Sequence, residues 1–89
     1  MKAILTVIGK DQVGIIAGVS TELQKLNINI LDVTQTIMHG YFTMIMMIDL
    51  SKISCDFDNV KKTLLKKGQV LGVDVKIQRE EIFNSMHTL

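Results

Sequence analysis

Residues 9–20 read GKDQVGIIAGVS and directly follow the run AILTVI at residues 3–8. The run, which we extend over residues 2–8, is apolar at consecutive positions, as is typical of a central strand covered on both faces. From Ile15 onward, apolar residues recur at helical spacing, which predicts a helix. A strand, a glycine-containing loop and a helix therefore follow one another. The residues of the loop indicate whether it could hold a phosphate, a small zwitterion or no ligand.

The loop has the glycine spacing of a nucleotide-binding P-loop but lacks the rest of that motif. Gly9 and Gly14 match, whereas Ile15 and Ile16 stand where a P-loop requires Lys and Ser or Thr. The first amides of a helix are nevertheless unpaired donors that suit a carboxylate. Asp11 is placed to bind an ammonium group, or alternatively to cap the helix. Together these groups match the two charges of a free amino acid.

Asn29 is the second polar candidate, because it opens the extended segment that follows the first helix. Its carboxamide both donates and accepts hydrogen bonds, as a ligand-orienting group must. Two placements are compatible with the sequence: beside the loop, or facing an adjoining subunit. The alternative role is that of a turn residue that satisfies local backbone.

The segments 27–38 and 41–50 predict two strands joined at His39 and Gly40. A two-residue connection of this kind is typical of a hairpin with positive φ at both central positions. Pairing across the turn predicts one core-facing set, which consists of Leu31, Val33, Ile37, Phe42, Met44, Met46 and Ile48. The opposite face of this hairpin is mixed, because it carries Ile45, Met47 and several threonines.

Two helices are predicted from the apolar spacing on either side of the hairpin. Asn27 suits the end of the first helix, Ser54 or Asp56 could cap the second, and Gly68 and Gly72 are expected to close it. The exposed lysines of the second helix are interpreted as a solvated face. The residues expected to point inward are Ile15, Ile16, Val19, Leu23, Leu26, Phe57, Val60, Leu64 and Leu65.

The C-terminal part of the chain completes the pattern. Residues 73–79 (VDVKIQR) alternate strictly and predict an edge strand protected by charge. The tail 80–89 predicts a short amphipathic helix. The order βαββαβ predicts a ferredoxin-like α+β fold, in which a four-stranded antiparallel sheet has two helices on one face. The 89 residues are long enough for one domain, 1–89, and too short for two.

Composition and charge exclude several classes of function. Ten Lys and Arg against nine Asp and Glu leave a net charge of +1, which predicts neither nucleic-acid nor membrane binding. The single Cys55 excludes an internal disulfide, and the sequence predicts no metal and no cofactor. No signal peptide or membrane span is evident, so we expect a cytoplasmic protein. His39 and His87 lie far apart, no Ser/His/Asp grouping is present, and we expect no enzymatic activity.

The stretch VIGKDQVGIIAGVSTELQKLNINI at residues 7–30 resembles the signature of the ACT domain family. Asp11, Gly14 and Ile15 occupy its D-x-x-G-hydrophobic positions, and Asn29 and Ile30 occupy the pair that opens the next strand. The element order over the remaining chain agrees with that family. More narrowly, GKDQVGI, GVS, LNINI and YFTMIMMI are similar to small stand-alone ACT proteins, including modules of the glycine cleavage system's transcriptional regulator.

The resemblance implies a regulatory, non-enzymatic module that binds an amino acid at an interface between modules. Asp11 would bind the ammonium or a polar side chain, Gly14 and Ile15 would present backbone groups, and Asn29 would reach the ligand from its own or a partner subunit. Val13 departs from the family pattern, in which many members have proline. The implied ligand-binding set is Asp11, Gln12, Val13, Gly14, Ile15, Asn29 and Ile30.

The resemblance also implies partners. We expect a homodimer or a higher homo-oligomer, with the second copy either on the open sheet face or along the edge of the second strand. No enzyme or DNA-binding domain is attached to the sequence, so the regulated target is expected to be a separate protein. The alternative is a purely structural dimerisation module that binds no small ligand.

Overall fold

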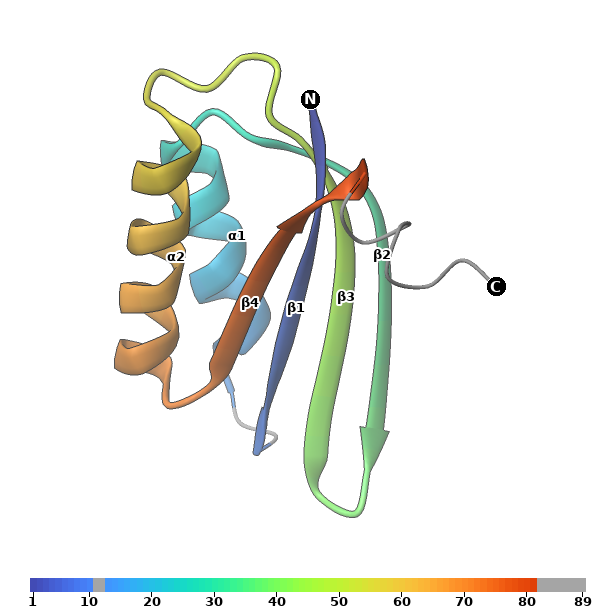
Figure 1. Ribbon diagram of the computed structural model, residues 1–89. Helices are drawn as coiled ribbons and strands as arrows, with labels where there is room; N and C mark the ends of the chain where they lie inside the picture. Colours follow the sequence, from blue (N-terminus) through green and yellow to red (C-terminus); the bar gives the residue numbers. More distant parts are fainter. Residues whose placement is uncertain (11–12, 82–89) are drawn as a thin grey trace.

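The computed structural model describes residues 1–10 and 13–81. The four strands form one antiparallel sheet in the order β2-β3-β1-β4, and both helices lie on one side of it (Figure 1). The predicted ferredoxin-like fold is therefore confirmed, whereas the predicted C-terminal helix lies mostly outside the described residues. The elements are β1 (Lys2–Lys10), α1 (Ile15–Lys25), β2 (Asn29–Met38), β3 (Tyr41–Asp49), α2 (Phe57–Leu71) and β4 (Asp74–Arg79).

Strand β1 lies in the middle of the sheet, between β3 and β4. Its residues Ala3, Leu5 and Val7 are fully buried and face the helices. The opposite face is only partly covered, because Ile4 is buried but Ile8 is 45% exposed. The prediction that β1 is covered on both faces is thus wrong for its C-terminal half, since both helices pack on the same side of the sheet.

The hairpin between β2 and β3 has the predicted turn. His39 and Gly40 have φ angles of 53° and 81°, so both central residues are left-handed, as a two-residue turn of this type requires. Ile37 consequently pairs with Phe42. The turn fixes which side chains of the two strands share a face, because side-chain direction alternates along each strand.

A β-bulge changes the pairing at the far end of this hairpin. The register shifts between Ile30 and Asp32, so that Ile30 and not Leu31 pairs with Ile48. The prediction that Leu31 joins the core-facing set is therefore wrong. The bulge inserts one extra residue into β2, and this residue cannot be anticipated from alternation alone.

Helix α1 buries Ile15, Val19 and Leu23, which recur every four residues. Ile16 was predicted to point inward, but it is 44% exposed. A spacing of one residue rotates a helical side chain by about 100°, so Ile15 and Ile16 do not both face the sheet. Leu26 is half-buried and packs against the core.

Helix α1 ends where Asn27 predicted its end, and the chain leaves it through a left-handed turn. Asn27 has a φ angle of 60°. Its N–H donates to the Gln24 carbonyl at 3.0 Å, and the N–H of Ile28 donates to the Leu23 carbonyl at 3.0 Å. These two bonds form a Schellman motif, which satisfies the last carbonyls of the helix and directs the chain into β2.

Helix α2 is capped as predicted by Asp56 and ended by Gly72. The Asp56 Oδ1 accepts a hydrogen bond from the Asn59 N–H at 2.8 Å, and Gly72 has a φ angle of 73°. Leu65 is exposed rather than inward. Gly68 was expected to help close the helix, but it is a buried residue inside α2. Glycine is needed there because a Cβ would lie 2.6 Å from the Val75 Cγ2.

The two edge strands of the sheet differ in length and character. Strand β4 has six residues and alternates polar and apolar positions, as predicted, with Asp74 and Lys76 exposed, Val75 partly buried and Ile77 buried. Strand β2 has ten residues, and most of its side chains are exposed. Its large exposed hydrophobic residues are Leu31, Val33, Ile37 and Met38.

Candidate functional site

The loop between β1 and α1 leads into the helix through a glycine. Gly14 is the N-cap residue of α1, with φ 94° and ψ −2°, so the N-cap position belongs to Gly14 and not to Asp11. Among the described residues, no side chain hydrogen-bonds to this helix start. Asp11 and Gln12 lie outside the described residues, and their roles stay predictions.

The first turn of α1 presents backbone amides toward the loop. The Gly14 carbonyl accepts the first helical hydrogen bond, from the Gly18 N–H at 2.8 Å. The amides of residues 15–17 therefore precede the helical ladder and point out of the helix end. Val13 is fully exposed and Ile15 is buried, so only the backbone of Ile15 can meet a ligand. Among the described residues, a Cβ at Gly14 would meet nothing within 4 Å, so none of them occupies the space beside these amides.

Asn29 lies at the opposite end of the helix. It is exposed at the start of β2, where it pairs with Asp49, and its neighbour Ile30 packs against the core. Helix α1 has 11 residues and separates the two groups by about 16 Å. Figure 1 shows the end of β1 and the start of α1 at one end of the molecule and the start of β2 at the other. Of the two placements considered for Asn29, the one beside its own loop is therefore wrong.

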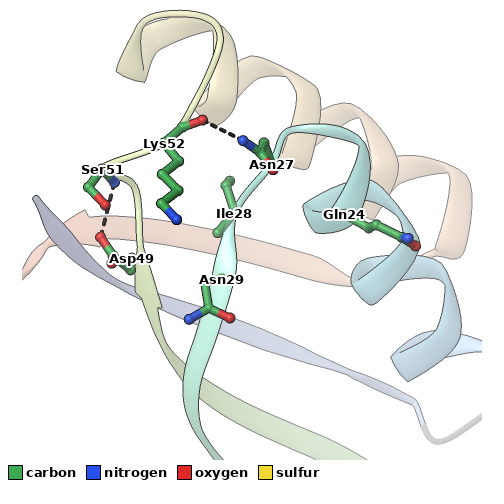
Figure 2. Close-up of a pocket in the computed structure, with 7 residues that line it drawn as sticks. All are labelled: Gln24, Asn27, Ile28, Asn29, Asp49, Ser51 and Lys52. Carbon is green, nitrogen blue, oxygen red and sulfur yellow. Dashed lines mark hydrogen bonds between the residues drawn. The ribbon is translucent and has the colours of Figure 1, made fainter.

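A pocket of about 350 Å³ lies beside Asn29 (Figure 2). It is built by the end of α1, the start of β2, and the loop that follows β3. The Asn27 Nδ2 donates to the Lys52 carbonyl at 2.8 Å, and this bond ties the end of α1 to the β3–α2 loop. The lining residues are Gln24, Asn27, Ile28, Asn29, Asp49, Ser51 and Lys52.

The pocket contains one carboxylate and one ammonium group. The N–H of Ser51 donates to the Asp49 Oδ1 at 3.0 Å. This hydrogen bond lowers the pKa of Asp49 below its usual 3.8, with smaller contributions in the same direction from the Ser51 side chain, the N-terminus and Lys2. Asp49 is therefore ionised at neutral pH. Lys52 forms no ion pair with any residue that the structure describes.

Sequence reasoning missed Asp49, Ser51 and Lys52 as site residues. They are separated from Asn29 by about twenty positions, and no motif links them. The β-bulge places Asn29 directly opposite Asp49. A perfectly regular hairpin would have paired Asn29 with Leu50, so the signal appears only once the register of the bulged strand is known.

The described part of the chain contains neither a candidate metal site nor a helix that could span a membrane. Residues 1–10 and 13–81 contain no group of three His, Cys, Asp or Glu side chains that could hold a metal ion. Neither helix of that part is long and apolar enough to cross a membrane.

Comparison with known proteins identifies the class of protein. The sequence pattern of the ACT domain matches residues 2–78. The fold resembles that of an ACT domain protein from Streptococcus pneumoniae, with a TM-score of 0.82, 43% identity and 93% of each chain covered. It also resembles a putative glycine cleavage system transcriptional repressor, with a TM-score of 0.77, 26% identity, and coverage of 88% of this chain and 44% of that one. The chain belongs to the ACT domain family.

The proteins that match this chain over nearly their whole length belong to a narrower group. The chain is 65% identical to a UPF0237 protein of Listeria innocua, with 100% of both chains covered. It is 48% identical to a UPF0237 protein of Methanocaldococcus jannaschii, with 99% of this chain and 98% of that protein covered. The predicted resemblance is confirmed. ACT domains are generally regulatory ligand-binding modules, and they commonly dimerise and bind amino acids.

Proposed function

We propose that this protein is a regulatory module that binds an amino acid or a related small metabolite between two copies of the chain. The single observation behind the proposal is that the two predicted halves of the site lie at opposite ends of α1. One chain cannot close such a site around a small ligand. Two chains related by a two-fold axis can.

The topology supports one particular pairing of two copies. Strands β1 and β2 are both antiparallel to β3, so they run in the same direction. The β1–α1 loop therefore lies at the end of the sheet where β2 finishes, and Asn29 lies at the end where β2 begins. If β2 pairs antiparallel with its copy, the loop of each subunit comes to the end that carries the partner's Asn29.

Strand β2 has the properties of a pairing edge. It has ten residues, and β3 is its only neighbour among the described strands. A long edge strand with exposed apolar side chains is a template for pairing with another chain. Ile37 is 56% exposed and Val33 is similarly open, although both share a face with the core residues Phe42 and Met46. A second copy along this edge would cover them.

The chemistry of the shared site follows from the groups that meet there. The carboxylate of the ligand accepts hydrogen bonds from the amides at Gly14, Ile15 and Ile16, where the helix dipole favours negative charge. Asp11 binds the ammonium group, and the partner's Asn29 orients the ligand. By the family resemblance, the set is completed by Gln12 and Val13 of the loop and by the partner's Ile30. The roles of Asp11 and Gln12 rest on the family resemblance.

The module is proposed to act in the cytoplasm on a separate protein. The support is that ACT domains are generally regulatory and that the relatives matched over their whole length contain only this domain. Binding at the subunit boundary provides the mechanism. A ligand that contacts both chains stabilises the dimer relative to the monomers, so its concentration sets the amount of the dimeric form.

A thermal melt with a panel of the common L-amino acids tests the proposal. A ligand present at about 100 times its dissociation constant stabilises the folded protein by roughly 2.7 kcal/mol, which raises the melting temperature by several degrees. We expect at least one amino acid to give such a shift. A dimer whose melt is unmoved by the whole panel would instead support the alternative, a structural dimerisation module.

A further inference from the structure

The pocket beside Asn29 combines a group that only donates with a group that only accepts. Lys52 carries an ammonium, which has three donors and no acceptor, and ionised Asp49 has acceptors and no donor. In Figure 2 the Lys52 side chain extends from the β3–α2 loop toward the start of β2. The carboxamides of Gln24, Asn27 and Asn29 can both donate and accept.

The side chains that line the pocket favour one kind of functional group on the ligand. A carboxylate on the ligand would be attracted by Lys52 but repelled by Asp49, and an ammonium group would be attracted by Asp49 but repelled by Lys52, so neither charge gains from both groups. An aliphatic group would find one apolar lining residue, Ile28, which is itself 7% exposed. A carboxamide is neutral, accepts from Lys52 through its oxygen and donates to Asp49 through its nitrogen.

The volume of the pocket and its position beside Asn29 suit the side chain of a bound amino acid. Its volume of about 350 Å³ is at the lower end of the range for small-molecule sites, which suits a ligand of amino-acid size. It adjoins Asn29, the residue that the proposed function places next to the partner's loop. A ligand whose α-groups lie at that loop can extend its side chain past Asn29 toward Lys52.

We propose that this pocket binds the side-chain carboxamide of the ligand, and that Lys52 and Asp49 determine specificity for an amino acid with such a side chain. The inference rests on the proposed function, because it takes the α-groups of the ligand to be held by the partner's β1–α1 loop. It adds the chemical class of the ligand and two residues outside the family signature.

Titration calorimetry with pairs of similar shape tests the inference. L-glutamine is compared with L-methionine, and L-asparagine with L-leucine, because each pair differs mainly in the polarity of the side-chain end. The variant Lys52→Met keeps the length of the side chain and removes its charge. Lys62→Met makes the same change on the exposed face of α2 and is the matched control.

We expect the carboxamide member of at least one pair to bind roughly tenfold or more tightly than its apolar partner. Lys52→Met should remove most of this discrimination, whereas Lys62→Met should leave it intact. A general loss of stability would weaken both members of a pair equally and would leave their ratio unchanged. The ratio therefore reports recognition rather than folding.

The outcomes separate this inference from the proposed function. If an apolar amino acid binds as tightly as its carboxamide partner, or if Lys52→Met keeps the wild-type ratio, the carboxamide subsite is overturned and the amino-acid module survives. If some other amino acid binds but none of the four does, the inference is again overturned alone. If no amino acid binds, both proposals fail.

Discussion

The ionisation of Asp49 in the pocket can be measured without a ligand, through its effect on the stability of the protein. Its carboxylate accepts a hydrogen bond from the Ser51 N–H, and its pKa lies below the usual 3.8. A lowered folded-state pKa means that Asp49 contributes stability above its unfolded pKa. This contribution is lost as the pH falls through the folded pKa.

The expected result is a difference in the pH dependence of stability. At pH 7 the wild type should be more stable than Asp49→Asn, which cannot accept the hydrogen bond as a charged group. The gap should close as the pH falls through the lowered folded-state pKa of Asp49, because the carboxyl group is then protonated in both the folded and the unfolded protein. Denaturant unfolding at each pH measures it. A gap that stays constant down to pH 2 would show that the Asp49 charge does not contribute.

At the scale of secondary-structure elements, the contact between α2 and β4 depends on Gly68. A Cβ at Gly68 would lie 2.6 Å from the Val75 Cγ2 and 3.0 Å from the Val73 carbonyl oxygen, which belongs to the backbone and cannot rotate away. We expect Gly68→Ala to destabilise the protein by about 1–3 kcal/mol, as overpacking does.

Gly18→Ala is the matched control for this prediction. Gly18 is also helical, but a Cβ there would be 3.0 Å from the Leu71 Cδ1, the end of a side chain that can adjust. Alanine is favoured over glycine inside a helix by about 1 kcal/mol, and this gain opposes the crowding. Gly18→Ala should therefore cost clearly less than Gly68→Ala in chemical denaturation. Equal costs at the two positions would refute the packing argument.

The elements were predictable from the sequence where local chemistry dictates them. His39-Gly40, Asn27 and Gly72 adopt left-handed turns that end strands or helices, and Asp56 caps α2 through its own side chain. The errors occur where tertiary packing decides. Gly68 stays inside α2 because Val75 needs the space, and the bulge at Leu31 follows from pairing with β3.

The candidate site was only partly predictable for the same reason. Gly14 and Asn29 stand in a recognisable pattern, and the structure shows each exposed at an end of α1. Asp49 and Lys52 carry no local signal, because the bulged hairpin and the Asn27–Lys52 hydrogen bond bring them to Asn29. Sequence patterns locate a backbone feature more readily than a pocket that several segments assemble.

The proposed assembly of two subunits depends on the edge of β2. Ile37→Lys places a charge on this edge at a side chain that is already 56% exposed, so the subunit should still fold. We expect this variant to be monomeric by analytical ultracentrifugation and to lose the ligand-induced melting shift, because a buried unpaired charge opposes association.

Val70→Lys is the control for this prediction. Val70 is 72% exposed on α2, away from the β2 edge, and receives the same chemical change. It should remain dimeric and bind ligand as the wild type does. If Ile37→Lys stays dimeric with a wild-type melt response, the copies do not meet along β2, and the open sheet face on which Ile45 lies becomes the better candidate.

The most direct test of the shared site is to mix two defective proteins. Asn29→Ala removes one half of the site. Gly14→Ala adds a Cβ beside the amides, at a strain cost of about 1–2 kcal/mol for a non-glycine residue in the left-handed region. Gly40→Ala, with a similar φ angle, controls for this cost. Calorimetry with the amino acid that shifts the wild-type melt should show neither variant binding alone.

After subunit exchange, a two-fold dimer with sites between its chains predicts recovery of roughly a quarter of the wild-type binding sites, because each mixed dimer contains one intact site. A mixture that binds no more ligand than either variant alone would show that Gly14 and Asn29 do not serve one site across the subunit boundary.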